Sequence, residues 1–430
     1  MSAELNRWSR LARRDFSRIA AKSLLGVSVL PGASQLMGQS KAARARKVIY
    51  FYLSGGMSHI DSFDPKPGSE VQGPTEAIGT SAGFQLSANF QAVASQSDRF
   101  SVIRTMTSQT GDHQGGRYYV RTGYKRLASI VHPDLAAWKK KLAPMQKKST
   151  LPFWVSIRDG SFPGDGFMGP NFAPVPLGNP TSGLPNSLPM VDEGAFQERL
   201  EMVNTFNEMF TRRFRTKEVR AYNEFYEHAL KLMTSEDLDA FDLSKMPTSR
   251  REKFGSGQGA DAAALAVQLN ENDVEYVHVN WGGWDNHSGI FESGPSRNFQ
   301  GLSQALAGTL EEVNLEDTMV VLATEFGRSP RINENRGRDH HPLAFSALVA
   351  GAGIKGGQAY GRTDKNAYAV EDDPVRPEDF NATLATAMGI PIDKVVFSPS
   401  GRPFLVAGHS EDPKTRQIVP VGQPVRELLS

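Results

Sequence analysis

The sequence predicts an α/β protein with a doubly wound, mostly parallel sheet flanked by helices. Apolar stretches of strand length recur along the chain, helical patterns separate them, and a polar, glycine-containing loop follows most of them. Continuous apolar runs are typical of strands covered on both faces, and strands that alternate with helices predict parallel pairing. Such a sheet gathers the C-terminal ends of its strands along one edge, where we expect the functional site.

Length and charge restrict the class of protein. The chain has 430 residues, a formal net charge of +1 and no cysteine. We expect a single domain over residues 46–430, with an insertion at about 154–189. A nearly neutral chain has no field that would gather nucleic acid, so we exclude a nucleic-acid partner. Without cysteine, any metal must be held by His, Asp or Glu.

Residues 1–45 predict a twin-arginine export signal. The stretch RRDF at residues 13–16 precedes a mostly apolar run that Lys22 and Pro31 interrupt. This run is too short and too interrupted for a membrane span. We therefore expect a periplasmic or secreted protein with no stable span after cleavage. An amphipathic N-terminal helix is the alternative. No clear Ala-x-Ala site identifies the cleaved bond, so an uncleaved anchor also stays open.

The elements follow in order along the mature chain. Apolar periodicity predicts the strands and three- and four-residue spacing predicts the helices, in which the aromatic residues of 195–233 are expected to pack. Residues 107–123 are expected as a loop, and the glycine- and proline-rich residues 154–189 as an irregular insertion over the sheet edge. The predicted strands are residues 47–53, 100–106, 274–279, 318–323 and 345–350, and the main predicted helices are 89–97, 195–233, 260–270, 299–313 and 378–388.

Histidines and carboxylates gather in the loops after these strands. Asp285 and His287 follow the strand at 274–279, and a second acid–histidine group at 339–341 precedes the strand at 345–350. A single histidine in such a loop is usually a hydrogen-bonding residue, but two matched groups at one sheet edge predict a metal site. Imidazole and carboxylate ligands suit Zn²⁺ first, with Mn²⁺, Ca²⁺ and Mg²⁺ as alternatives. The candidate ligands are Asp285, His287, Glu325, Asp339, His340, His341, His59 and Asp61.

Several stretches resemble a known family. They read LSGGMSHIDSFDPKP, VHPDLAAW, VEYVHVNWGGWDNH, TEFGRSP and GRDHHP. Together they resemble the bacterial exported family called domain of unknown function 1501, which is regarded as sulfatase-like within the alkaline phosphatase superfamily. The resemblance covers residues 47 to about 408. It implies the superfamily's fold and a metal-dependent hydrolase of phosphate or sulfate esters.

The resemblance also implies roles for individual residues. The superfamily's first metal-binding aspartate falls near Gly55, and its nucleophile falls at His113, followed by Arg117. Glu325 keeps the carboxylate of an Asp-His pair, while Phe326 replaces the imidazole. One metal centre is implied, and a second keeps only Glu325 unless His59, Asp61 or His113 completes it. The implied ligands of the intact centre are Asp285, His287 and His341, with Asp339 or His340 as additions.

Two functions remain open from the sequence. The first is an exported hydrolase of a phosphate or sulfate ester on a small molecule or glycan. In this function Arg117 clamps the oxyanion and His113 serves as ligand or base rather than nucleophile. The alternative is a catalytically degenerate protein of the same fold that binds a metal or an anionic glycan. The missing hydroxyl nucleophile favours the second function, and the number of retained ionisable residues favours the first. The oligomeric state also remains open.

Overall fold

A computed structural model describes residues 45–430, apart from 146–148, 160–162, 186, 188–190 and 215. The predicted export signal lies outside the described residues. In the part of the chain that the structure describes, no helix combines the length and the apolar character that a membrane span requires.

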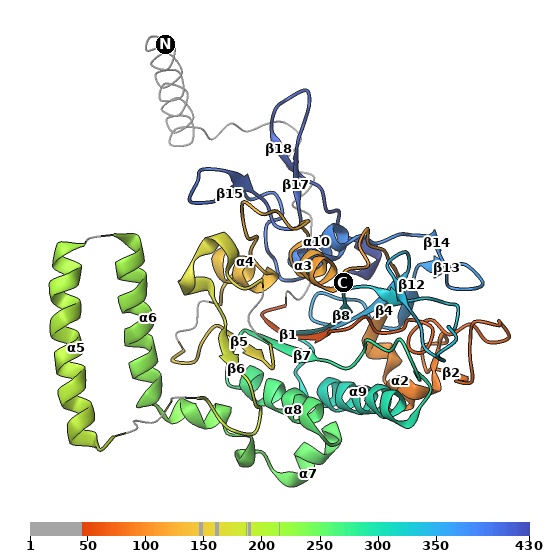
Figure 1. Ribbon diagram of the computed structural model, residues 1–430, viewed down its shortest axis with the longest axis horizontal. Coiled ribbons are helices and arrows are strands. Elements are labelled where there is room, and N and C mark those ends of the chain that lie inside the picture. The colour runs from red at the N-terminus through yellow and green to blue at the C-terminus, as the bar shows by residue number, and fades with distance from the viewer. Residues whose placement is uncertain (1–44, 146–148, 160–162, 186, 188–190, 215) are drawn as a thin grey trace. The chain divides into compact units, whose positions relative to one another are not determined.

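The core is an eight-stranded sheet, which confirms the predicted fold class (Figure 1). One strand, β11, is antiparallel to both of its neighbours, and the other pairs are parallel. The strand order is β12 (Gln358–Tyr360), β4 (Phe100–Met106), β11 (Phe345–Gly351), β8 (Thr318–Thr324), β1 (Lys47–Leu53), β7 (Tyr276–Trp281), β5 (Trp154–Ile157) and β6 (Val175–Leu177).

Helices cover both faces of the sheet. Successive side chains of a strand point to opposite faces, so Phe51 of β1 joins one hydrophobic cluster and Tyr50 joins the other. Figure 1 shows α8 and α9 on one side of the sheet and α3, α4 and α10 on the other. These helices are α8 (Gln258–Glu271), α9 (Ser293–Glu312), α3 (His113–Thr122), α4 (Leu135–Leu142) and α10 (Pro377–Ala387).

The expected loop at residues 107–123 is in fact largely helix α3, so this prediction was wrong. The Asp112 side chain caps the helix by accepting from the backbone N–H of Gly115, and Gly123 ends it at a φ of 70°. Two consecutive glycines in the first turn hid the helical pattern. A larger residue at Gly116 would crowd Glu325, because an added Cβ would lie 3.0 Å from the Cβ of Glu325 and 3.2 Å from its carbonyl oxygen.

The stretch 154–189 is less irregular than its composition predicts. It supplies β5 and β6, which extend the sheet beyond β7 in parallel register and form its edge. Each strand has four residues or fewer. Such short segments among glycines and prolines carry too little periodicity to be recognised in a sequence.

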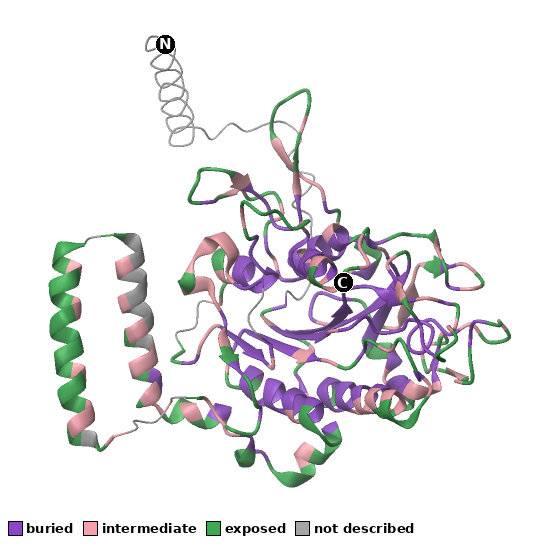
Figure 2. Cartoon of the chain, viewed as in Figure 1, coloured by how far each residue is buried: buried purple, intermediate pink, exposed green. Residues whose placement is uncertain are grey.

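Residues 195–233 are helical as predicted, but they form two helices, α5 (Glu193–Arg213) and α6 (Lys217–Met233). The predicted packing of the α5 aromatics was wrong. Phe206, Phe210 and Phe214 are 63%, 52% and 44% exposed, and Figure 2 shows α5 as largely exposed. A three- and four-residue spacing predicts one apolar face of a helix, but it does not say that anything covers that face.

Candidate metal centre

Four parallel strands deliver their following residues to one edge of the sheet. Gly55 follows β1, Asp285 and His287 follow β7, Glu325 follows β8, and the loop after β4 leads into α3 at His113. The edge of an α/β sheet at the strand C-termini is where such folds place their ligands. The sequence prediction that these loops meet therefore agrees with the geometry.

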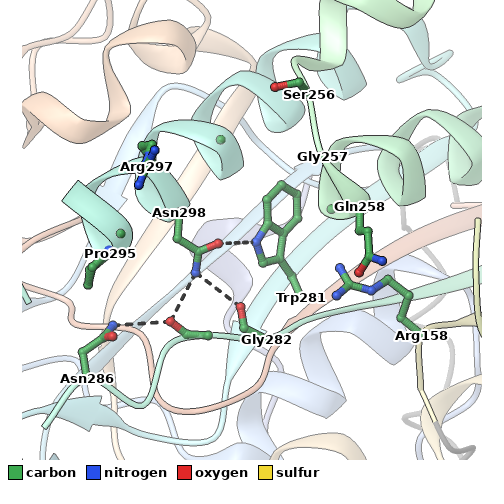
Figure 3. Close-up of a pocket in the computed structure, with 14 residues that line it drawn as sticks. Arg158, Ser256, Gly257, Gln258, Trp281, Gly282, Asn286, Pro295, Arg297 and Asn298 are labelled. Atoms are coloured by element: carbon green, nitrogen blue, oxygen red, sulfur yellow. Dashed lines mark hydrogen bonds between the residues drawn. The ribbon is translucent and has the colours of Figure 1, made fainter. Parts of the chain in front are cut away.

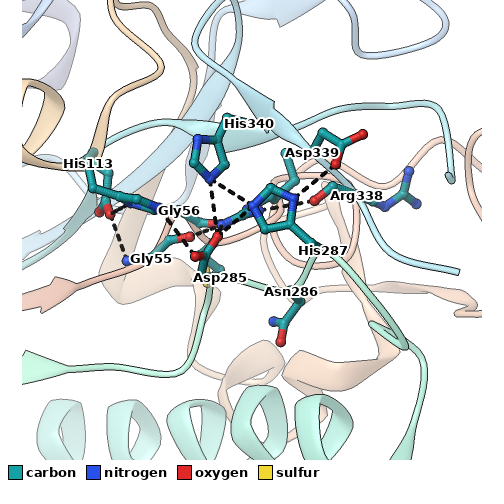
Figure 4. A network of polar contacts seen from close by, with 12 residues as sticks. Gly55, Gly56, His113, Asp285, Asn286, His287, Arg338, Asp339 and His340 are labelled. Atoms are coloured by element: carbon teal, nitrogen blue, oxygen red, sulfur yellow. Dashed lines mark hydrogen bonds and ion pairs between the residues drawn. The ribbon is translucent and has the colours of Figure 1, made fainter. Parts of the chain in front are cut away.

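Three histidines and one carboxylate form a compact cluster there (Figure 4). The carboxylate of Asp285 lies 3.4 Å from Nε2 of His113, 3.0 Å from Nε2 of His287 and 3.1 Å from Nε2 of His340. Candidate ligand atoms of His113, Asp285 and His340 all lie within 4.8 Å of one another. We call these four residues the metal cluster.

The second ring nitrogen of each histidine contacts a hydrogen-bond acceptor. Nδ1 of His113 lies 2.8 Å from Glu325 Oε1, Nδ1 of His287 lies 2.9 Å from Asp339 Oδ1, and Nδ1 of His340 lies 2.7 Å from the carbonyl oxygen of Gly111. An Nδ1–H donates in each case, because carboxylates and carbonyls only accept. Each Nε2 therefore turns a lone pair inward, as it does in histidines that bind metals.

The inward lone pairs need a positive charge between them. Nε2 of His287 and Nε2 of His340 lie only 3.0 Å apart. Two acceptors at that distance repel each other unless a proton or a metal cation lies between them. Ligands of a tetrahedral Zn²⁺ at its usual bond lengths lie about 3.3 Å apart. Asp285, His287 and His340 lie at spacings close to this value, and His113 lies 3.4 Å from the Asp285 carboxylate beside them.

Electrostatics keeps the cluster's carboxylate ionised. Burial raises the pKa of Asp285, but the hydrogen bond from Arg328 and the positive charge of that guanidinium outweigh it and hold the pKa well below its usual range. The hydrogen bond to Glu325 raises the pKa of His113 above its ordinary value. The side chains of Asp285 and His287 are 49% and 47% exposed, so solvent and a substrate can reach the cluster.

The turn after β1 leaves no room for the carboxylate that the superfamily resemblance places near Gly55. Gly55 has a φ of 119°, and an added Cβ would lie 2.6 Å from the backbone nitrogen of Asp285. Its own N–H instead donates to Glu325 Oε1 at 2.7 Å. Glu325 also accepts from the hydroxyl of Tyr52 at 2.8 Å. Glu325 therefore supports His113 and does not lie among the inward-facing ligand atoms.

The two adjacent histidines of strand β10 (His340–His341) point to opposite sides and contact different residues. Strand β10 pairs with β9 (Gly327–Arg328), and neighbouring side chains on a strand point to opposite sides. His340 enters the metal cluster, whereas Nε2 of His341 donates to the carbonyl of Tyr368 at 2.6 Å. The geometry therefore favours His340 over His341 as the ligand, which departs from the expectation.

His59 and Asp61 also lie apart from the metal cluster. Nε2 of His59 donates to the carbonyl of Ala367 at 2.9 Å, and its ring stacks against His341. Asp61 accepts two hydrogen bonds from the guanidinium of Arg338, at 2.8 and 3.2 Å. All of these residues are buried, and His59, Asp61, Arg338 and His341 are referred to below as the buried cluster. Both histidines bind backbone carbonyls and Asp61 binds Arg338, so the buried cluster has a structural role.

Arg117 has a partner inside the fold. Its guanidinium contacts Asp159 and lies 5.4 Å from the centre of the Tyr52 ring. Asp159 also accepts from Arg121 at 2.6 Å, one turn further along α3. This network fixes α3, and so His113, on the sheet. An oxyanion clamp at Arg117, as expected from the sequence, would have to compete with Asp159.

Three supporting residues were not singled out from the sequence. Arg328 is fully buried, donates to the carbonyls of Gly55 and Gly56, and contacts Asp285. Tyr52 donates its hydroxyl to Glu325, the partner of His113, and Asp159 contacts Arg117 of α3. Arg328 lies within the stretch TEFGRSP, and its position in this polar loop was the signal that could have identified it. Tyr52 lies inside an apolar strand and gave none.

The family model described as "Protein of unknown function (DUF1501)" matches residues 45–415. The chain belongs to this family. No curated protein matches it.

Solved structures of the alkaline phosphatase and sulfatase type are similar to the chain. An alkaline phosphatase from the Antarctic bacterium TAB5 is 12% identical, with 82% of this chain and 100% of that chain covered and a TM-score of 0.34. A protein in the alkaline phosphatase superfamily from Vibrio parahaemolyticus is 11% identical, with 89% and 83% covered and a TM-score of 0.39. The sulfatase PsFucS1 from Pseudoalteromonas sp. is 12% identical, with 81% and 69% covered and a TM-score of 0.35. At these values the similarity gives no information on the reaction of this DUF1501 protein.

Proposed function

We propose that this DUF1501 protein is a metal-dependent hydrolase of a phosphate or sulfate ester, with the cation held by His113, Asp285, His287 and His340. The observation that carries the proposal is the convergence of three Nε2 lone pairs and one ionised carboxylate, each imidazole fixed by an acceptor at Nδ1. Zn²⁺ suits this ligand set best, and Mn²⁺ is the next choice.

The chain's own residues prepare this site for catalysis. A bound divalent cation would lower the pKa of a water molecule and polarise an ester oxygen. Asp339 and Glu325 hold the rings of His287 and His113 in the ligating tautomer. Phe326 is fully buried and packs against the rings of His113 and His340, so it forms an apolar wall that limits their movement. The half-exposed Asp285 and His287 leave one side of the cluster open for the substrate.

The test starts with the metal content of the purified protein. We expect about one equivalent of metal by elemental analysis, loss after chelation, and ester hydrolysis that returns with Zn²⁺ or Mn²⁺. Aryl phosphates, phosphodiesters and aryl sulfates serve as substrates. The Asp285→Asn variant should lose both metal and hydrolysis, whereas Asp372→Asn, at an exposed carboxylate paired with Arg362, should keep both. Equal metal content in the two variants contradicts the proposal.

A second candidate function is metal or anionic-glycan binding without turnover. The backbone at Gly55 excludes the metal-binding carboxylate that the superfamily resemblance places there, and Arg328 already neutralises part of the charge of Asp285. Among the described residues, the metal cluster holds no hydroxyl side chain that could act as a nucleophile. Stoichiometric metal with no hydrolysis of any of the three ester classes selects this function.

Export is proposed from the sequence alone. The stretch RRDF at residues 13–16 and the weakly apolar run behind it support a twin-arginine signal and a periplasmic or secreted location. Residues 1–45 fused to a reporter that folds before export should carry it out of the cytoplasm. Replacing both Arg13 and Arg14 with lysine should retain the reporter inside, and unchanged export would contradict the signal.

A further inference from the structure

A second polar pocket lies beside the loop that carries Asp285 and His287. It has a volume of about 610 Å³, within the usual size range of small-molecule sites. The starts of α8 and α9 and the end of β7 form its walls. Figure 3 shows Arg158 and Gln258 on one side of Trp281 and Arg297 on the other.

The lining of this pocket is positively charged. Among the described residues that line it, Arg158 and Arg297 carry charge and none is an aspartate or a glutamate. The other polar side chains are neutral, and six glycines leave the backbone accessible. A concave site with two guanidinium groups and no carboxylate favours an anion, because guanidinium binds oxyanions through paired hydrogen bonds.

Arg158 and Gln258 keep their polar groups available. Among the described residues, neither side chain has a hydrogen-bond or ion-pair partner, and Nε of Arg297 donates only to the carbonyl of Ser293, at 3.0 Å. By contrast, the Asn298 side chain is held by Trp281 Nε1 at 2.7 Å and by two backbone carbonyls. Burial lowers the pKa of Arg158. Available donors at a positive pocket wall are what an oxyanion needs.

The backbone of Arg158 is held in an unusual conformation. Arg158 has a φ of 60°, which is uncommon for a residue other than glycine. Its N–H donates to Leu177 at 2.7 Å, and its carbonyl accepts from the Asn280 side chain at 3.2 Å. Such strained residues cluster at functional sites, where neighbouring structure holds them in place. Here the neighbouring strands hold Arg158 at the pocket.

We propose that this pocket binds the oxyanion group of a small polar ligand, a carboxylate, sulfate or phosphate on a molecule of sugar size. The pocket and the metal cluster share one loop: Asp285 and His287 face the cluster, while Asn286 lines the pocket and points away from the cluster (Figure 4). The identity of the substrate rests on the proposed hydrolysis. If the metal cluster hydrolyses an ester while the pocket binds an anion of the same molecule, the substrate is an ester that carries a second anionic group. The binding site itself does not depend on the metal.

Calorimetry with four probes tests the pocket. Glucose 6-sulfate, glucose 6-phosphate and glucuronate carry the three anionic groups, and glucose is their uncharged counterpart. The measurements use the wild-type protein and the metal-free His340→Ala variant, so that binding at the metal cluster is separated from binding in the pocket. We expect at least one anion to bind both proteins more tightly than glucose does, and the preferred anion identifies the oxyanion.

Arginine variants complete the test. Arg158→Gln and Arg297→Gln should each weaken binding of the preferred anion by about 10- to 100-fold, because each removes a charged hydrogen-bond donor. Arg426→Gln makes the same change in net charge at an exposed residue outside the pocket and should leave binding unchanged. The proposal is overturned if no anion binds better than glucose, or if Arg158→Gln and Arg426→Gln behave alike. Neither result depends on hydrolysis, so failure of the proposed function is seen separately.

Discussion

Two histidine–carboxylate clusters lie on either side of strand β10, and they use the same residue types for different purposes. In the metal cluster, the histidines donate through Nδ1 and leave Nε2 facing a carboxylate. In the buried cluster, His59 and His341 donate through Nε2 to backbone carbonyls, and Arg338 already neutralises Asp61. The comparison teaches that partners and exposure, rather than residue type, separate a candidate binding site from a structural cluster.

The adjacent histidines of β10 give the sharpest test of this comparison. Loss of an outer-shell partner lowers metal affinity by about 10- to 100-fold. His340→Ala should lower it by more than that, because it removes a ligand. His341→Ala removes the same ring one residue away and should keep the metal. Elemental analysis and metal titration of both folded variants measure the difference. Metal loss in His341→Ala alone would reverse the assignment.

Breaking the ion pair of the buried cluster should affect stability instead of metal binding. Arg338→Met leaves the buried carboxylate of Asp61 without its guanidinium partner and should lower the free energy of unfolding by about 3–5 kcal/mol. Replacing Asp61 with leucine in the same protein should restore part of that loss. Denaturant unfolding measures both variants. A metal affinity that falls in the folded Arg338→Met protein would mean that the two clusters are coupled.

The buried cluster should also make stability depend on pH. Burial lowers the pKa of His59 to about 4, from an ordinary value of 6.5. As the pH falls from 6.5 to 4, the unfolded chain gains a proton that folded His59 resists, so stability falls. The contribution is about 3 kcal/mol, present in full above pH 6.5. His59→Gln should remove this part of the pH dependence in chelated protein. Parallel stability curves of the two proteins would count against it.

The smallest effect is expected from the support behind the metal cluster. Glu325→Gln weakens the acceptor at Nδ1 of His113 and should lower metal affinity by about 10- to 100-fold while the site remains intact. Glu378 accepts a tyrosine hydroxyl at 2.7 Å much as Glu325 does at 2.8 Å, so Glu378→Gln is a matched control that should not change metal affinity. Equal affinities in both variants would leave Glu325 without a role at the metal.

The sheet could be predicted from the sequence because its strands are covered on both faces. Residues 47–53 and 100–106 are strands at the predicted bounds, since continuous apolar runs have few other uses. Helix α3 was missed because Gly115 and Gly116, which lie close to Asp112 and Glu325, interrupt the helical pattern of its first turn. The reversed direction of β11 was missed because an apolar run says nothing about strand polarity.

The site could be predicted to the level of its loops but not of its individual ligands. Asp285, His287 and His340 were among the candidates because they follow or precede strands. The choice between His340 and His341 depends on which side of a two-residue strand each faces, and pairing register is not visible in GRDHHP. The pocket at Arg158 gave no signal, because its lining residues come from the end of β7 and the loop after it, from the starts of α8 and α9, and from the residue after β5.

The short β9–β10 ladder has a consequence for folding. His340 pairs with Arg328, and His341 pairs with Gly327. A slip of one residue in this ladder would turn His341 toward Asp285 and His340 toward Tyr368, since alternate side chains exchange sides. A cation that binds only the native arrangement stabilises the correct alignment over the shifted one. Binding of the proposed cation would therefore also select the native strand register.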